Sequence, residues 1–418
     1  MPPDLSPAWT LPFAAILLAT GVLPIVAPRV WREPGKQAAI VVGLASPALL
    51  FLLAREPAAL GHALLEYASF ITLLGALYVI SAGVLVTGDI PATPAVNGAA
   101  LLAGAVLANV LGTTGASMLL LRPLLRVNHA RARRTHTFVF FIFLVSNVGG
   151  CLTPIGDPPL LLGYLAGVPF GWTLRLWPAW MFLVASLLAV YLVIETVEHR
   201  REGPRPEPLQ RARAGLEGAH NLAYLAVVVA AVALVERPWR EAAMLGAAVL
   251  SWRTTPRVVH ERNHFAVEPM AEVAVLFAAI FVAMVPALWI LEARAPALGI
   301  TRPWQFFVAA GSLSAVLDNA PTYLAFVSIA KGLRGALAAG APTVAIDGVP
   351  VAEAHLVAIS LGSVFWGAVT YLGNGPNLLV KALAERAGVR MPGMGGYLAW
   401  SAAVLLPLLG CVALLFLL

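Results

Sequence analysis

The chain has 418 residues, of which 60% are hydrophobic and only 11% are charged. With a mean hydropathy of +0.85, this composition excludes a soluble domain and predicts an all-α polytopic membrane protein. The net charge of +6 does not indicate nucleic-acid binding, because the basic residues gather in short loops between apolar runs. Cys151 and Cys411 lie in separate apolar runs, so a disulfide framework is not expected.

Apolar runs of membrane-spanning length follow one another along the chain. The uninterrupted runs lie near 9–28, 38–54, 63–87, 172–196, 219–235, 239–252, 270–291 and 396–418. Gly, Pro, Asn, Asp or Thr interrupt four further runs near their middle, at 95–126, 137–168, 303–334 and 355–387. We therefore expect about ten spanning helices, together with two re-entrant hairpins and two broken helices.

Arginine and lysine concentrate in five loops, at 29–36, 126–134, 198–213, 253–262 and 386–390. Basic loops face the cytoplasm in membrane proteins, and placing all five there fixes the topology. The first interrupted run then enters and leaves on the cytoplasmic side, and the third enters and leaves on the outer side. Hairpins of opposite orientation predict an inverted repeat, with an N-terminal half at 1–218 and a C-terminal half at 219–418.

The two broken helices also match in sequence. The segment LTPIGDPPLLL (152–162) aligns with VTYLGNGPNLL (369–379) at a constant shift of 217 positions. The hairpin segments VLGTTGAS (110–117) and VLDNAPTY (316–323) match more weakly. Paired interrupted segments are the best sequence signal for the binding site of a transporter. The shift superposes three pairs of residues: Thr153 and Thr370, Gly156 and Gly373, and Asp157 and Asn374.

The stretch SNVGGCLTPIGDPPLLL, at 146–162, combines flexible glycines, helix-breaking prolines and a carboxylate. A backbone break inside a bilayer is tolerated only where protein or a watery cavity satisfies its polar groups. The break places Asp157 at the start of the second half-helix, and an ionisable residue within the membrane indicates a functional site. The alternative is a helix N-cap that stabilises by about 1 kcal/mol. The two roles are compatible.

The other interrupted segments add neutral oxygens and a second deep carboxylate, Asp318, which are the ligands that hard cations prefer. Competition between a cation and protons for these carboxylates would give exchange. The predicted cation- and proton-binding residues are Asp157, Asp318, Asn319, Asn147, Thr153, Asn374, Thr370 and Thr322. The residues predicted to contact substrate near the hairpin tips are Thr113, Thr114, Ser117, Ser146 and Asn377.

Other charged residues fall near the predicted ends of spans, where long side chains reach the membrane interface. We expect an interfacial position for Glu66, Glu195, Glu272, Arg175 and Lys381. Three histidines near span edges, of which His136 is one, are weaker candidates for pH sensing.

The motifs resemble a known superfamily. N-V-G-G-C-L-T-P-I-G-D, at 147–157, is similar to the NhaD-type pattern, and L-D-N-A-P-T, at 317–322, is similar to the second acidic hairpin motif of that group. The chain thus resembles the ion transporter superfamily, closest to its NhaD-type sodium/proton antiporters and its citrate transporters. The resemblance implies a homodimer with a scaffold part and a mobile transport part, whose ion site includes Asp157, Asp318 and Asn319.

One feature departs from the antiporter pattern. Members of that group tend to carry an acidic residue in the first hairpin, where this chain has Gly112. Thr113 and Thr114 are instead similar to the hydroxyl-bearing and amide-bearing hairpin tips of the carboxylate transporters. The departure leaves the stoichiometry and the cation open.

Three functions are compatible with these patterns. The first is a secondary cation/proton antiporter, with Na⁺ and H⁺ as the transported ions and no cofactor. The second is an ion-coupled citrate or dicarboxylate transporter, and the third is a membrane scaffold that transports nothing. The sequence contains no P-loop, zinc spacing or G-x-S-x-G, so an enzyme is not expected. We expect a multi-pass protein of the plasma membrane, the inner membrane of a prokaryote, with lipid and small ions or carboxylates as its partners.

Overall fold

The computed structural model describes residues 5–31, 33–87, 91–202, 215–263, 265–337 and 340–418. Arg32 and most of the predicted basic loop at 198–213 lie outside the described residues. Helices make up almost all of the described structure, as the composition predicted, and the fold is an all-α polytopic membrane protein. Within the described ranges, the strands form two short antiparallel pairs: β1 (Leu85–Thr87) with β2 (Gly215–Glu217), and β3 (Thr343–Ile346) with β4 (Val349–Ala352).

Within the described residues, eight helical segments are long and apolar enough to cross a membrane. Six correspond to predicted uninterrupted runs, and the other two belong to interrupted runs. Two further predicted runs, 219–235 and 239–252, form the shorter helices α9 (Asn221–Leu234) and α10 (Trp239–Thr254). The six helices at the uninterrupted runs are α1 (Leu11–Val26), α3 (Pro34–Arg55), α4 (Pro57–Ala82), α8 (Trp177–Glu202), α12 (Glu268–Arg294) and, across a π-helical turn at Ser401–Leu405, the pair α17 (Met394–Trp400) and α18 (Leu406–Phe416).

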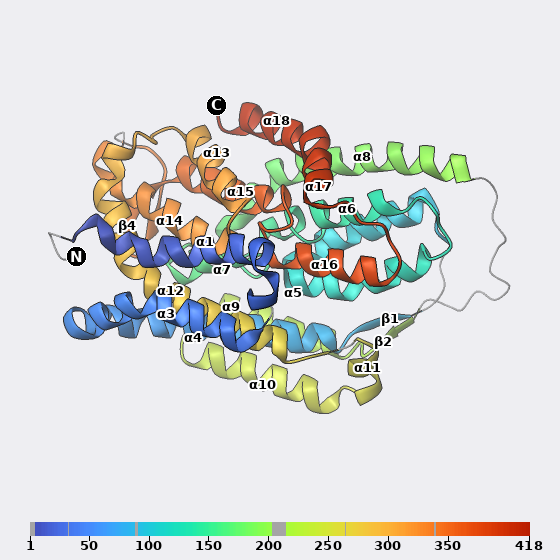
Figure 1. The fold of residues 1–418 in the computed structure, drawn as a ribbon, viewed down its shortest axis with the longest axis horizontal. Coiled ribbons are helices and arrows are strands. Elements are labelled where there is room, and N and C mark those ends of the chain that lie inside the picture. Colours follow the sequence, from blue (N-terminus) through green and yellow to red (C-terminus); the bar gives the residue numbers. More distant parts are fainter. Residues whose placement is uncertain (1–4, 32, 88–90, 203–214, 264, 338–339) are drawn as a thin grey trace.

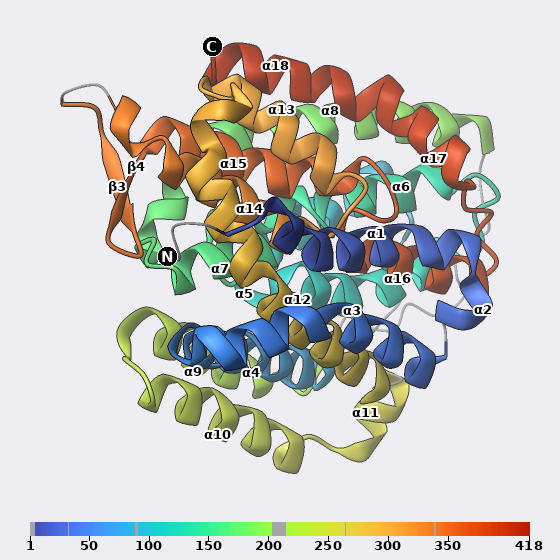
Figure 2. The ribbon, with the colours of Figure 1, turned by 60° about the vertical axis from the view of Figure 1, so that its left-hand side comes forward.

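Helices α3, α4, α9, α10 and α12, which we call the lower group, lie together in Figure 2. Within this group, α12 packs against α3 and α4, and α10 packs against α4 and α9. Two short helices, α2 (Pro28–Trp31) and α11 (Arg257–Arg262), connect longer ones. Helices α8, α17 and α18 lie on the opposite side of the molecule. Between these layers lie the interrupted segments, which we call the central group.

The two predicted hairpins are both present in the central group. Helix α5 (Pro94–Val127) reverses at Gly112, whose φ of 73° is accessible to glycine and costly for other residues. The second hairpin joins α13 (Pro303–Ser314) to α14 (Asn319–Gly332) through a short reversal. Figure 1 shows α5 towards the right-hand end of the molecule and α13 with α14 towards the left-hand end. The hairpins therefore approach the centre from opposite ends, as an inverted arrangement requires.

The two broken helices share their local geometry. One consists of α6 (Thr135–Leu144), a 3₁₀ turn and α7 (Pro158–Leu165), and the other of α15 (Glu353–Phe365), a 3₁₀ turn and α16 (Gly375–Arg386). Asp157 and Asn374 precede their half-helices with nearly equal backbone angles, φ −146° and ψ 143° against φ −151° and ψ 139°. At both breaks two glycines cross so closely that a Cβ on the second, Gly156 or Gly373, would lie within 2.7 Å of a carbonyl oxygen. The similar backbone angles and the similar glycine contacts at the two breaks support the proposed repeat.

Helices that meet the predicted basic loops end on one side of the molecule. The ends of α5 and α16, together with the short helix α11, lie towards the right in Figure 1. We call this side the arginine-rich end, after the loops 126–134, 253–262 and 386–390. The β3–β4 hairpin and the start of α14's partner helix α13 lie at the opposite end.

Candidate functional site

The site is centred on Asp157, at the break in the first broken helix. Its backbone occupies the N-cap position of α7, yet its side chain makes no capping hydrogen bond. The side chain is 1% exposed. Pro158 follows at the first helical position and fixes the start of the half-helix. The carboxylate is therefore free to point away from its own helix and into the centre of the protein.

Three neutral side chains donate hydrogen bonds to this carboxylate. Thr113 Oγ1 lies 2.9 Å and Asn374 Nδ2 lies 3.2 Å from Asp157 Oδ1, and Asn319 Nδ2 lies 2.7 Å from Asp157 Oδ2. Thr113 belongs to the first hairpin, Asn319 to the second, and Asn374 to the second broken helix. All four interrupted segments thus meet at one carboxylate. Among the described residues, Asp157 forms no ion pair.

A further layer of amides surrounds these contacts. Asn147 Nδ2 donates to Asn377 Oδ1 at 2.7 Å, and Asn377 Nδ2 donates to the carbonyl oxygens of Gly367 and Thr370. Asn147 Oδ1 is buried and has no hydrogen-bond partner in the described part of the chain. It lies 3.0 Å from the position that a Cβ on Gly367 would occupy, and Asn319 Nδ2 lies 3.6 Å from the same point. An unused buried acceptor beside the Asp157 partners is suited to bind a cation.

The predicted threonines fix the breaks to the hairpins. Thr153 Oγ1 donates to the carbonyl oxygen of Asn109 at 2.5 Å, and Thr370 Oγ1 donates to that of Ala315, also at 2.5 Å. Asn109 also accepts a hydrogen bond from the backbone N–H of Leu152, at 2.8 Å. The sequence prediction missed Asn109, although this asparagine directly precedes the hairpin segment 110–117. These threonines hold backbone and do not contact the Asp157 carboxylate.

Two more predicted residues, Ser117 and Ser146, form a hydrogen bond of 2.8 Å between their hydroxyl groups. The carbonyl oxygen of Ser146 also accepts from Asn374 Nδ2 at 3.1 Å. Both serines are fully buried, so they join the first hairpin to the first broken helix rather than facing a cavity.

Asp318 occupies a different environment from Asp157. Its carboxylate accepts from the backbone N–H of Ala320 at 3.0 Å, which is the geometry of an N-cap on α14. Thr322 Oγ1 donates to the carbonyl oxygen of Asp318 at 2.9 Å. Among the described residues no hydrogen bond joins Asp318 to Asp157, but the residue adjacent to Asp318, Asn319, donates one to Asp157. The second carboxylate is therefore adjacent in the chain to a residue of the site, Asn319, and does not itself bond to Asp157.

A cavity of about 270 Å³ lies beside Asp157, between the central group and the lower group. Asp157 is the only charged residue among the described residues that line it. Thr113 and Thr114 line it from the first hairpin, and α7 and α16 both begin at its wall. The lower group contributes apolar side chains of α4 and α12, from Leu73 to Tyr78 and from Pro269 to Val273. The cavity can admit a small ion or a small organic solute to the carboxylate.

Residues 3–417 match the sequence profile of a protein family described as "Putative citrate transport". The match covers nearly the whole chain. The chain belongs to this family. No curated protein matches the sequence significantly. Family membership and the helical membrane fold identify the molecule as a multi-pass membrane transporter, in agreement with the superfamily resemblance of its motifs.

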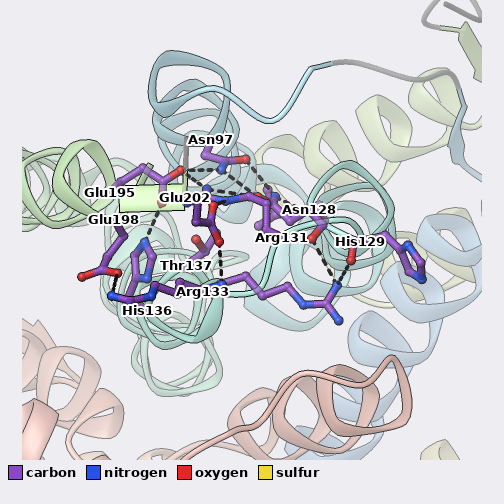
Figure 3. A network of polar contacts seen from close by, with 12 residues as sticks. Asn97, Asn128, His129, Arg131, Arg133, His136, Thr137, Glu195, Glu198 and Glu202 are labelled. Carbon is purple, nitrogen blue, oxygen red and sulfur yellow. Dashed lines mark hydrogen bonds and ion pairs between the residues drawn. The ribbon is translucent and has the colours of Figure 1, made fainter. Parts of the chain in front are cut away.

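This member of the citrate-transport family has a second polar cluster, which lies at the arginine-rich end of the molecule. Figure 3 shows Glu195 of α8 facing Arg131, with which it forms an ion pair, and His136 of α6. His136 Nε2 lies 2.5 Å from Glu195 Oε2, and Asn97 Nδ2 of α5 lies 3.0 Å from Glu195 Oε1. Glu202 accepts from Arg131 Nε at 3.2 Å.

Glu195 was expected near the end of a span with its side chain reaching the membrane interface, but the structure buries that side chain inside the protein. Its side chain is fully buried, because the loop at 126–134 folds back over α8 and covers it. A buried carboxylate needs a partner of opposite charge, and Arg131 supplies it.

Proposed function

We propose that this transporter is a cation/proton antiporter, with Na⁺ as the cation, that uses Asp157 as its exchange site. The observation that carries the proposal is a single buried carboxylate on one interrupted segment, which accepts hydrogen bonds from neutral donors on the other three and faces a cavity. A buried ionised carboxylate without a cation is costly. Binding of either a cation or a proton would remove most of that cost, so the two compete for the same group.

Competition at one carboxylate produces exchange. When Na⁺ binds, Asp157 must be ionised, and the neutral oxygens around it, Asn147 Oδ1 above all, complete the coordination. When a proton binds, the site is neutral without a cation. The empty ionised site would be the one state that cannot cross the bilayer centre cheaply, which suppresses movement without an exchanged ion.

Asp318 is the second acidic group in this proposal. Its carboxylate caps α14 directly before Asn319, the residue whose amide holds Asp157 Oδ2. Protonation of Asp318 would weaken that cap and loosen Asn319. We therefore propose that Asp318 contributes to proton coupling by positioning Asn319, rather than by binding the cation directly.

The second candidate function is ion-coupled transport of citrate or a related carboxylate. The description of the family favours it. The cavity also offers the beginnings of α7 and α16 together with the hydroxyl groups of Thr113 and Thr114, and helix N-termini attract anions. Against it, no Arg, Lys or His stands among the described residues that line the cavity, and Asp157 would repel an anion unless a cation were bound first.

Reconstituted vesicles that enclose a pH dye separate the two functions. The purified protein is reconstituted in these vesicles, Na⁺, Li⁺, K⁺ or citrate is added to the outside solution, and the pH inside the vesicles is followed. The antiporter proposal predicts a pH change with Na⁺ or Li⁺ that Asp157→Asn abolishes. Glu33→Gln, a surface carboxylate next to Lys36, is the matched control and should exchange normally.

Two results would contradict the antiporter. Normal exchange in a folded Asp157→Asn variant would remove the carboxylate from the mechanism. No response to any cation, combined with citrate uptake under a Na⁺ gradient, would establish the carboxylate transporter and leave Asp157 as its coupling-ion site.

A further inference from the structure

A second cavity, of about 200 Å³, lies at the end of the molecule opposite the arginine-rich end. Helices α4, α7, α12 and α14 line it, together with Asp347 in the turn between β3 and β4. The backbone N–H of Asp347 donates to the carbonyl oxygen of Ala166 at 2.8 Å, which holds the strand pair against the end of α7. We call this the distal cavity and the one beside Asp157 the inner cavity.

The two cavities lie in series along the same helices. Helix α7 lines the inner cavity with Asp157 and Leu161 and the distal cavity with Leu162 and Leu165. At a rise of 1.5 Å per residue, Asp157 and Leu165 are separated by about 12 Å along the helix. Helices α4 and α12 also line both, each with one half of its length. The distal cavity therefore continues the line that starts at Asp157.

A layer of aromatic side chains lies between the two cavities. Phe70 of α4 packs against Phe277 and Phe281 of α12 with tilted rings, whose centroids lie 4.7 Å and 5.5 Å away. All three rings are buried. These rings are apolar. Phe70 and Phe277 lie on α4 and α12 between the segments that line the two cavities, and Phe281 itself lines the distal cavity. Among the described residues, the two cavities share no lining residue.

The charges of the distal cavity are unevenly paired. Lys331 Nζ lies 2.9 Å from Asp347 Oδ2, and Arg334 lies 2.6 Å from Glu292, so both cations already have an acidic partner. Within ion-pair distance Glu66 of α4 has only His62, at 3.1 Å, and the positive charge of His62 depends on protonation. Lys331 and Arg237 act on Glu66 electrostatically from farther away. Among the described lining residues, Glu66 is therefore the carboxylate without a permanent cation within ion-pair distance, and its side chain is only 18% exposed.

We propose that Glu66 is the residue that receives the cation or proton on the distal side of the transport path and passes it to Asp157. This inference rests on the proposed exchange function. A carboxylate at this position concentrates cations in the cavity. The residue acts on access from the distal side only, because Glu66 lines the distal cavity and not the inner cavity that holds Asp157.

Side-specific kinetics test the proposal. Membrane vesicles of both orientations are prepared from a chain that carries Arg257→Cys, on α11, to mark the arginine-rich face. We expect Glu66→Gln to raise the Na⁺ concentration for half-maximal exchange about tenfold at the distal face and to leave it unchanged at the arginine-rich face, a difference of about 1.4 kcal/mol. Glu66→Asp should recover part of the loss. Glu272→Gln, on α12 outside both cavities, is the matched control and should change neither value.

Equal changes at both faces, or no change at either, would overturn the role of Glu66. A second measurement does not depend on exchange: Glu66→Cys, in a chain with Cys151→Ala and Cys411→Ala, is exposed to a positively charged thiol reagent that cannot cross membranes. Labelling from the distal face supports the proposal, and labelling only from the arginine-rich face, or from neither, contradicts it. If the Glu66→Cys variant is labelled from the distal face while Asp157→Asn still exchanges normally, the function proposed for Asp157 is contradicted, and the access route through the distal cavity is still supported.

Discussion

Asp157 and Asp318 both occupy the N-cap position of a helix, α7 and α14 respectively, yet only Asp318 uses its side chain as a cap. The capping carboxylate satisfies a backbone N–H of its own helix, a common stabilising role. Asp157 leaves that role unfilled and accepts three hydrogen bonds from three other segments instead. A carboxylate that gives up local stabilisation for contacts across the whole site is the stronger candidate for a binding residue.

A substitution of Asn147 tests whether the residues around Asp157 bind a cation. Its Oδ1 is buried without a partner, and we propose that it binds the cation. Asn147→Ala should raise the Na⁺ concentration for half-maximal exchange about tenfold, or about 1.4 kcal/mol. The measurement is exchange in vesicles as a function of Na⁺ concentration.

A matched control separates lost binding from lost stability. Asn221 is equally buried and donates hydrogen bonds to Gly83 and Thr255, far from the cavity. Asn221→Ala should lower thermal stability as Asn147→Ala does, but should leave the Na⁺ dependence unchanged. An Asn147→Ala variant with unaltered Na⁺ dependence would show that the acceptor is not part of the site.

The sequence alone predicted which types of residue form the site, but it did not predict which of them contact Asp157. Glycine, proline and a carboxylate in one apolar stretch can be recognised without a structure, because a broken helix in a membrane needs them. The partners of Asp157 come from segments up to 217 residues away, and no local pattern states which of several threonines and asparagines will face it. Thr153 and Thr370 were therefore grouped with the ion site, although their hydroxyl groups hold the backbone of the hairpins.

At the scale of elements, the buried cluster around Glu195 joins α5, α6 and α8 at the arginine-rich end (Figure 3). Arg131→Met should destabilise the protein by about 3–5 kcal/mol, because it leaves the buried carboxylate of Glu195 without its cation. Thermal unfolding in detergent measures the change. Adding Glu195→Gln to the same chain should recover part of the stability.

An exposed ion pair provides the comparison. Arg201 lies 2.8 Å from Glu198 and its side chain is 60% exposed, so Arg201→Met should cost less than about 1 kcal/mol. Equal losses for the two arginine variants would mean that burial does not determine the strength of the Glu195 cluster.

His260, on α11 outside the spanning helices, makes one contact of the lower group sensitive to pH. Its ring packs 4.7 Å from Trp252, and neither ring nitrogen has a hydrogen-bond partner among the described residues. Burial lowers the pKa of His260 below its usual value of 6.5. The unfolded chain therefore binds the proton first, and His260 reduces the stability as the pH falls below about 6.5.

The expected result is a loss of thermal stability between about pH 7 and 5 that is smaller in His260→Phe than in the unmodified protein. His129→Gln, at an exposed position of the same end, is the control and should keep the full pH dependence. Identical pH profiles in the His260→Phe variant and the unmodified protein would show that the buried ring does not contribute.

The sequence predicted the elements of the membrane part because their apolar length and their interruptions are local properties. Hairpins at 95–126 and 303–334 and broken helices at 137–168 and 355–387 correspond closely to α5, α13–α14, α6–α7 and α15–α16. The burial of Glu195 could not be predicted in the same way, because it depends on how one loop folds over a distant helix. The β3–β4 pair escaped notice because its two short strands lack a long alternating pattern.

At the scale of the whole molecule, the cavities lie where the central group meets the lower group. We propose that transport moves these two groups relative to each other and carries Asp157 from one side to the other. The division into an N-terminal and a C-terminal repeat and the assembly into a homodimer are parts of the same proposal. Matched backbone angles at Asp157 and Asn374 support the repeat.

Linking the two groups should stop exchange in both directions. Leu77 of α4 and Thr114 of the first hairpin both line the inner cavity. A reducible bifunctional thiol reagent applied to Leu77→Cys/Thr114→Cys, without native cysteines, should abolish exchange until the link is reduced. Val86→Cys/Leu216→Cys, at paired positions of β1 and β2, is the control and should continue to exchange when linked. Full exchange with Leu77 and Thr114 linked would exclude relative motion of the two groups at this cavity.

The central claim is that Asp157 binds a cation in competition with protons. Its most direct test is calorimetric titration of the purified protein with Na⁺, in two buffers that differ in ionisation enthalpy. The difference in heat between the buffers counts the protons released as Na⁺ binds. We predict Na⁺ binding with proton release in the unmodified protein and neither in Asp157→Asn. Na⁺ binding of equal affinity in the folded Asp157→Asn variant, or binding without proton release in the unmodified protein, would contradict the account.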